Sequence, residues 1–61
     1  MTFDYILRRE GSAARCGFTV EAANRDDADE ELVRRMLSSG WKLTEVLHWQ
    51  IAAVTERGHG R

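Results

Sequence analysis

The chain is 61 residues long, carries a net charge of −1 and contains one cysteine. This length allows one domain with one small core, worth roughly 3–5 kcal/mol, and a single cysteine excludes an internal disulfide. The near-neutral charge excludes the overall basic field that steers a whole chain to nucleic acid. The longest apolar stretch, residues 51–54, is too short to span a membrane.

The lone thiol and the first residues favour a cytoplasmic protein without a membrane segment. Residues 1–5 include Asp4 and lack the apolar core of a secretory signal, and Cys16 is the only cysteine. Because the core is small, we expect further stability from a homodimer, another oligomer or a partner protein.

The first 22 residues predict a β-hairpin. Residues 2–9 and 14–22 both alternate apolar and polar side chains, and the short stretch 10–13 between them contains Gly11, a turn signal. An isolated two-stranded sheet is unstable in water, so its apolar face needs a cover. That face carries Phe3, Tyr5, Leu7, Phe18 and Val20.

The stretch from Asn24 to Trp41 predicts an amphipathic helix that supplies this cover. Asn24 or Asp26 can accept the free N–H groups of the first turn, and acidic residues follow at the positive end of the helix dipole. Gly40 fits the left-handed position that ends a helix, with Trp41 packing back on Met36. The predicted buried stripe is Ala28, Leu32, Val33, Met36 and Leu37.

Residues 41–57 allow two structures. As a helix, Thr44 would cap it and Leu47, Ile51 and Val54 would form a stripe. As a strand, Trp41, Leu43, Leu47 and Trp49 would share one face. The β-branched and aromatic content favours strand: one long strand bulged near residues 48–50, or two strands with a tight turn. We expect residues 58–61 to be a frayed end.

These elements predict a single domain over residues 1–61 of the α+β class, with ββαβ order and possibly ββαββ. One helix packs across one face of an antiparallel sheet. The predicted core is Phe3, Tyr5, Leu7, Phe18, Val20, Ala28, Leu32, Met36, Trp41 and Leu43.

Three short runs resemble known proteins. Residues 40–43 (Gly-Trp-Lys-Leu), with Val46 following, look like the Gly-Trp-Glu-Leu signature of a small bacterial domain family of unknown function, although Lys42 replaces its usual Glu. Residues 18–22 and the acidic helix start are similar in layout to small phage-encoded ββαβ or ββαββ proteins, some of which are anti-CRISPR inhibitors. Residues 32–47 also resemble the start of a helix-turn-helix motif, but too little chain follows for its second helix. None of these resemblances implies catalytic residues.

The acidic block at the helix start is the first candidate binding surface. A rigid row of carboxylates can compete for the basic channel of a nucleic-acid-handling complex, and the phage resemblance implies an inhibitor of such a host complex. The simpler interpretation is a solvated helix start that satisfies the dipole. The block consists of Asp26, Asp27, Asp29, Glu30 and Glu31.

Two further surfaces are candidates. Arg8, Arg9 and Arg15 lie near the hairpin loop and could contact phosphate or RNA, or could be ordinary solvated charges at strand ends. Trp49, together with Leu47, Ile51 and Val54, could anchor a protein partner, or Trp49 could belong to the core. Patches of opposite charge on one small domain would also suit head-to-tail or two-fold self-association.

The sequence argues against an enzyme and predicts no cofactor and no metal. Cys16, His48 and His59 are too few and too scattered for a structural zinc site, and no catalytic Ser/His/Asp order or phosphate-binding glycine loop is present. Cys16 alternates with core residues and is expected to be a small apolar filler. The predicted function is therefore a small non-enzymatic binding protein.

Overall fold

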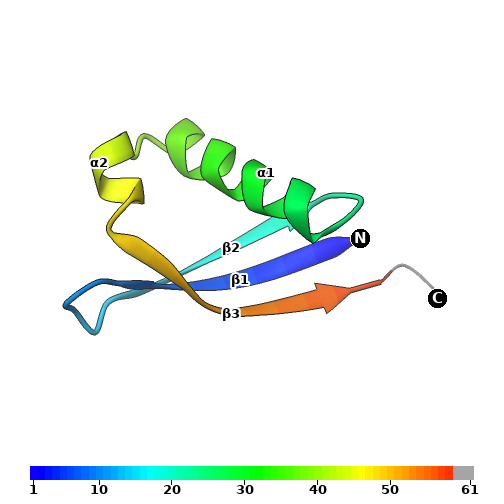
Figure 1. Ribbon diagram of the computed structural model, residues 1–61, viewed down its shortest axis with the longest axis horizontal. Coiled ribbons are helices and arrows are strands. Elements are labelled where there is room, and N and C mark those ends of the chain that lie inside the picture. Colours follow the sequence, from blue (N-terminus) through cyan, green and yellow to red (C-terminus); the bar gives the residue numbers. More distant parts are fainter. Residues whose placement is uncertain (59–61) are drawn as a thin grey trace.

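The structure is a computed structural model that describes residues 1–58, and it has the predicted α+β architecture (Figure 1). In chain order the elements are β1 (Thr2–Arg9), β2 (Arg15–Glu21), α1 (Arg25–Ser38), α2 (Leu43–Val46) and β3 (Trp49–Arg57). The strands form one antiparallel sheet in the order β2-β1-β3, so β1 is central and β3 is an edge strand. Among the described residues no helix is long and apolar enough to cross a membrane.

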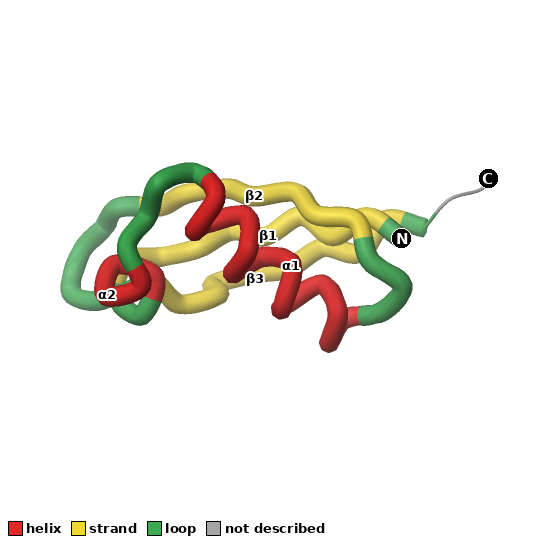
Figure 2. The backbone as a smooth tube through the Cα atoms, turned by 90° about the horizontal axis from the view of Figure 1, so that it is seen from above, coloured by secondary structure: helices red, strands yellow, loops and turns green. Residues whose placement is uncertain are grey.

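The helices lie on one face of the sheet and leave the other face open. Seen from above, α1 crosses the sheet diagonally, from the side of β3 at its first residues to the side of β2 at its last (Figure 2). The short helix α2 lies beside the end of α1, above the start of β3. This diagonal leaves a corner between α1, α2 and the first half of β3.

The predicted hairpin and helix are confirmed, and so are the predicted turn glycine of the hairpin and the predicted ends of the helix. Gly11 takes a positive φ of 72° in the hairpin loop. The Asn24 side chain accepts a hydrogen bond from the Asp27 N–H at 2.9 Å, which caps the start of α1. Gly40 has φ 96°, and the N–H of Trp41 donates to the Met36 carbonyl at 3.2 Å. These are the contacts of a Schellman ending, so both ends of α1 follow from local residues.

The core matches most of the predicted residues but not Leu43, which is 58% exposed. Val46 is buried in its place, because α2 turns Leu43 outward and Val46 toward the sheet. Phe18 and Trp41 are only partly buried and pack at the edge of the core, with ring centroids 5.6 Å apart. The buried residues are Phe3, Tyr5, Leu7, Val20, Ala28, Leu32, Met36 and Val46.

The strand favoured for residues 41–57 is wrong over residues 41–48, since residues 43–46 form the single helical turn of α2, and it is confirmed from Trp49 onward. Thr44 does not cap it: the N-cap is Lys42, with no side-chain hydrogen bond. One strand, β3, follows and is irregular at Ala52, because Ile6 pairs with Ala53 while Leu7 pairs with Ile51. The bulge is therefore farther along the chain than residues 48–50. Gly58 is exposed beyond β3, and the rest of the expected frayed end, 59–61, lies outside the described residues.

Candidate functional site

Arginines of the same helix pair closely with two of the five acids at the start of α1, Asp29 and Glu31. Asp29 accepts a hydrogen bond from the Tyr5 hydroxyl at 2.5 Å and one from Arg25 Nε at 2.9 Å. These donors, Tyr5 first, hold the pKa of Asp29 below its ordinary value. Burial, together with the same hydrogen bond, raises the pKa of Tyr5 to about 12. Asp29 therefore fastens α1 to β1.

The remaining acids of the block differ in how closely other groups of the domain pair with their carboxylates. Glu31 lies 2.6 Å from Arg34 and 3.7 Å from Arg35, whereas Glu30 has only a long 3.9 Å contact with Arg34. Asp27 takes part in the cap, where its side chain accepts from the Asn24 amide at 3.5 Å. Asp26 is exposed and makes no hydrogen bond or ion pair within residues 1–58. Asp26 and Glu30 are thus the acids most open to a partner.

The structure separates the three hairpin arginines that the sequence grouped together. Arg9 lies on the helix-bearing face and forms two bonds to Glu45, from Nε at 2.9 Å and from its terminal nitrogen at 3.3 Å. Arg8 and Arg15 lie opposite each other on the open face of the sheet. Arg9 is therefore committed within the chain, and the basic candidate surface consists of Arg8 and Arg15 alone.

Trp49 is half-buried and holds α2 in place. Its indole N–H donates to Glu45 at 2.9 Å, and its ring lies 5.2 Å from that of Trp41. Together, Arg9 and Trp49 lower the pKa of Glu45, with Arg9 the larger influence. Trp49 thus lies at the edge of the core and also forms one wall of the surface described next.

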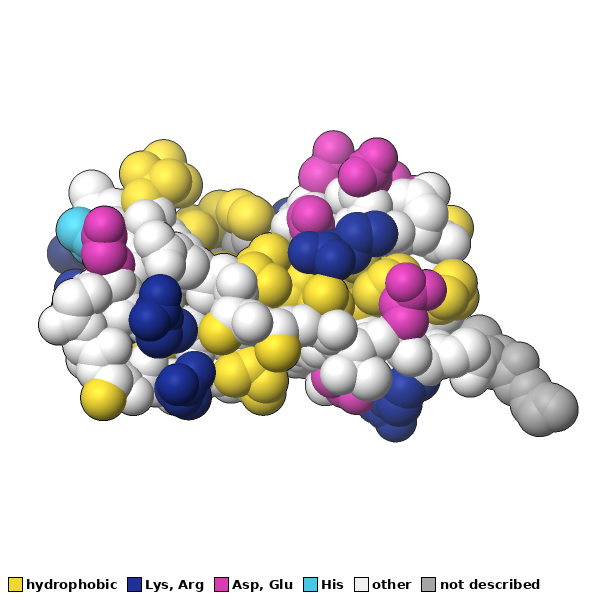
Figure 3. Space-filling model, turned by 60° about the horizontal axis from the view of Figure 1, so that its bottom comes forward, with side chains coloured by type: hydrophobic (Ala, Val, Ile, Leu, Met, Phe, Trp, Pro, Cys, Tyr) yellow, Lys and Arg dark blue, Asp and Glu magenta, His cyan; other side chains and the backbone are white. Residues whose placement is uncertain are grey.

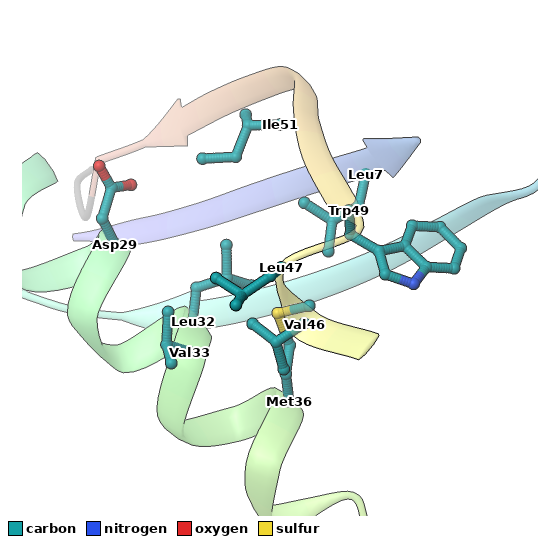
Figure 4. Close-up of a pocket in the computed structure, with 9 residues that line it drawn as sticks. All are labelled: Leu7, Asp29, Leu32, Val33, Met36, Val46, Leu47, Trp49 and Ile51. Carbon is teal, nitrogen blue, oxygen red and sulfur yellow. The ribbon is translucent and has the colours of Figure 1, made fainter. Parts of the chain in front are cut away.

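An apolar groove opens in the corner between α1, α2 and β3 (Figure 4). Its volume is about 300 Å³. Leu47 is 73% exposed, Ile51 42% and Val33 39%. In a space-filling view from below, apolar side chains gather between the helix layer and the β3 edge (Figure 3). The lining residues are Leu7, Asp29, Leu32, Val33, Met36, Val46, Leu47, Trp49 and Ile51.

Sequence reasoning found part of this groove and missed the rest. The predicted partner surface grouped Leu47, Ile51 and Val54 with Trp49, but Val54 packs against the core and does not line the groove. The predicted buried stripe included Val33 and Leu37, which are both exposed. The missed contribution depends on the diagonal path of α1, which leaves the side of the helix that carries Val33 uncovered. Periodicity in the sequence gives the width of an apolar stripe but not which part of it a sheet will cover.

No three His, Cys, Asp or Glu side chains within residues 1–58 gather closely enough to hold a metal ion. Cys16 is a half-buried free thiol, and Nδ1 of the His48 imidazole lies 3.9 Å from the Glu10 carboxylate. The groove itself presents one carboxylate, Asp29, which Tyr5 and Arg25 already engage.

Comparison with known proteins gives no relative to guide interpretation. No family model, no curated protein and no solved structure matches this chain. The resemblances to anti-CRISPR proteins and to the Gly-Trp-Glu-Leu family therefore rest only on the residues quoted for them.

Proposed function

We propose that the chain is a non-enzymatic protein-binding domain, that its binding surface is the apolar groove, and that a second copy of the chain occupies it. The observation that carries this proposal is the exposure of Leu47 beside a groove walled by Val33 and Ile51. Contiguous exposed aliphatic side chains on a small domain mark an interaction site.

A second copy fits because the surface has both a projecting side chain, Leu47, and a groove that can receive one. In a two-fold dimer the same patch is used twice, so Leu47 of each copy can enter the groove of the other. Figure 4 shows Leu47 projecting from the end of α2 toward the space between α1 and β3. Full burial of a leucine side chain contributes roughly 1.5–3 kcal/mol, and a dimer gains this twice. That gain is comparable to the stability that a core of this size supplies, roughly 3–5 kcal/mol.

The test is sedimentation equilibrium of the wild type beside two variants of α2 and its end. Leu47→Asp should convert the dimer to monomer, because the charge would be buried in the partner's groove. Leu43→Asp is the matched control: Leu43 is also strongly exposed on α2 but does not line the groove. The wild type should also melt at a temperature that rises with protein concentration. A wild type that stays monomeric, or equal loss of dimer in both variants, would refute the proposal.

A second candidate function is docking of the acidic helix start on a host nucleic-acid-handling complex, as a phage-type inhibitor would do. What favours it is the exposure of Asp26 and Glu30, whose charges the helix does not closely neutralise. It remains a prediction, weakened by the arginines that engage Asp29 and Glu31.

The structure sharpens the test of this second candidate. Asp26→Lys with Glu30→Lys reverses the open acids and leaves the cap and the Glu31 pairs intact. The control adds two lysines at Ala53 and Thr55, which are exposed on the open face of the sheet. Recovery of a nucleic-acid-bound complex from host lysate by the wild type and the control, but not by the double reversal, is the expected result. Equal recovery by all three proteins would exclude the acidic start as the docking surface.

A further inference from the structure

Two arginines stand apart from every other arginine in residues 1–58. Each of the others is ion-paired, whereas Arg8 and Arg15 have no carboxylate partner within the described chain. The pairs are Arg9–Glu45, Arg25–Asp29, Arg34–Glu31, Arg35–Glu31 and Arg57–Asp4. In a chain with a near-balanced charge, this leaves two positive charges unmatched in one place.

The sheet holds these two charges directly against each other. Arg8 on β1 pairs in register with Arg15 on β2, and both side chains are exposed on the face that carries no helix. Opposed residues of neighbouring strands have Cβ atoms only about 4.5–5.5 Å apart, and like charges there are destabilising. Figure 3 shows basic side chains next to one another on this face, toward the hairpin end. Such a pair is stabilised by an anion placed between the two guanidinium groups.

A neutral donor completes the arrangement. Gln50 on β3 lies opposite Arg8, and its Oε1 accepts from a terminal nitrogen of Arg8 at 3.3 Å. That bond leaves the Gln50 NH₂ group as a donor on the same surface. An open hollow of about 370 Å³ lies here, lined by Arg8, Arg15, Gln50, Ile51 and Ala52. None of these residues carries a negative charge, so every charged or amide donor of the hollow favours an anionic ligand.

We propose that this hollow binds a phosphate monoester. Such a group carries a charge of roughly −1.5 to −2 near neutral pH and three acceptor oxygens, which match two guanidinium forks and one amide. The open face carries no aromatic side chain among the described residues, because Phe3, Tyr5, Phe18 and Trp49 all lie on the other face. Binders of single-stranded nucleic acid stack bases on aromatic rings, so the ligand is a small phosphorylated molecule rather than a nucleic acid strand.

The full chain can be tested by NMR titration with inorganic phosphate, using chloride at matched ionic strength as the reference. The side-chain N–H signals of Arg8, Arg15 and Gln50 should shift with phosphate, and the melting temperature should rise. Arg15→Gln should weaken phosphate binding about tenfold or more, because it removes a charge-assisted hydrogen bond. This variant should fold, since it removes a like-charge contact from an exposed site.

A further pair of variants tests the site with a carboxylate that is attached to the sheet and competes with phosphate for Arg15. Gly17 lies two residues after Arg15 on β2, and a Cβ there would meet only ordinary contacts, 3.7 Å from the Tyr5 carbonyl oxygen. Gly17→Glu should abolish phosphate binding by pairing with Arg15, whereas Gly17→Gln should preserve it. Shifts that chloride reproduces, or an Arg15→Gln variant that titrates like the wild type, would overturn the proposal. Tighter binding of an oligothymidylate than of phosphate at the same residues would overturn the monoester assignment.

Discussion

Each of the two helices of this domain is tied to the sheet by one carboxylate, but different interactions stabilise the two helical conformations. In α1, Asp29 accepts hydrogen bonds from an aromatic hydroxyl, Tyr5, and from Arg25. In α2, Glu45 accepts from an aromatic N–H, Trp49, and from Arg9. In α1 only the Tyr5 hydroxyl comes from a strand, because Arg25 belongs to α1 itself. In α2 both donors come from strands, Trp49 from β3 and Arg9 from β1.

The two helices differ in the interactions that stabilise them apart from this carboxylate. α1 has 14 residues, a capped start, a Schellman ending and three buried side chains. α2 has four residues, no side-chain cap and one buried side chain, Val46. Helix formation has a costly first turn, so a segment as short as α2 forms only where other parts of the chain hold it. The Asp29 bridge therefore adds stability to a helix that its own sequence already favours. The Glu45 bridge, in contrast, is needed for α2 to form.

The largest expected effect comes from breaking the contact of α1 with the sheet. Leu32→Ala removes a buried leucine and should cost about 2–5 kcal/mol, enough to unfold most or all of the protein. Leu43→Ala on α2 is the control and should change the free energy of unfolding by less than about 0.5 kcal/mol, because Leu43 is exposed. Urea unfolding followed by circular dichroism measures both. Equal destabilisation by the two variants would contradict the exposed position of Leu43.

Acid should weaken both bridges together. The pKa values of Asp29 and Glu45 are lowered by their donors, Tyr5 and Arg9 first, so the unfolded chain binds protons more readily than the folded one. This stabilisation is present above the ordinary carboxyl pKa of about 4 and is lost as the pH falls through the lower folded values. Unfolding midpoints measured from neutral pH into acid should fall accordingly, and a constant midpoint would contradict the assignment.

Alkali should weaken only the bridge of α1. The pKa of Tyr5 is raised to about 12 from 10.0, so the folded state holds this proton more tightly than the unfolded chain. The corresponding stabilisation is complete below pH 10 and is lost as the pH rises through about 12. Tyrosinate absorbance recorded alongside circular dichroism should show ionisation and unfolding occurring together. Ionisation near pH 10 without unfolding would mean that the bond from Tyr5 to Asp29 does not hold.

A smaller effect is expected at the cap of α1. Asn24→Ala leaves the Asp27 N–H without its acceptor and should cost about 1 kcal/mol of global stability. Asn24→Ser is the matched control, since serine caps about as well as asparagine and adds no negative charge next to Asp27, and it should unfold like the wild type. A loss of stability in both variants would place the role of Asn24 elsewhere than in the cap.

The smallest global effect should come from Glu45→Gln, which weakens the bonds to Arg9 and Trp49. Hydrogen exchange should speed up in residues 43–48 while α1 stays protected, because α1 does not depend on this bridge. Glu30→Gln, in a long and exposed contact with Arg34, should leave both helices unchanged. Faster exchange throughout α1 in the Glu45 variant would mean that the two helices form one cooperative unit.

The sequence predicted the candidate surfaces only in part, because tertiary contacts decide which charged side chains stay unpaired. The sequence named the acidic block and the three hairpin arginines as charges, but their partners come from tertiary contacts. Glu45 lies 36 residues from Arg9, and Tyr5 lies 24 residues from Asp29. Once these are paired, the basic surface shrinks to Arg8 and Arg15, and the open acids to Asp26 and Glu30. Charge counting along the chain cannot show which charges will be neutralised.

The sequence by itself determined the hairpin, both ends of α1 and most of the core, because alternation, capping and the glycine ending act over neighbouring residues. It did not determine residues 42–48, where the β-branched and aromatic content favoured a strand. The tertiary structure made this segment a helical turn, because Arg9 and Trp49 converge on Glu45 only once β1 and β3 are paired. The groove has the same origin, since it exists only where the diagonal path of α1 leaves Val33, Leu47 and Ile51 uncovered.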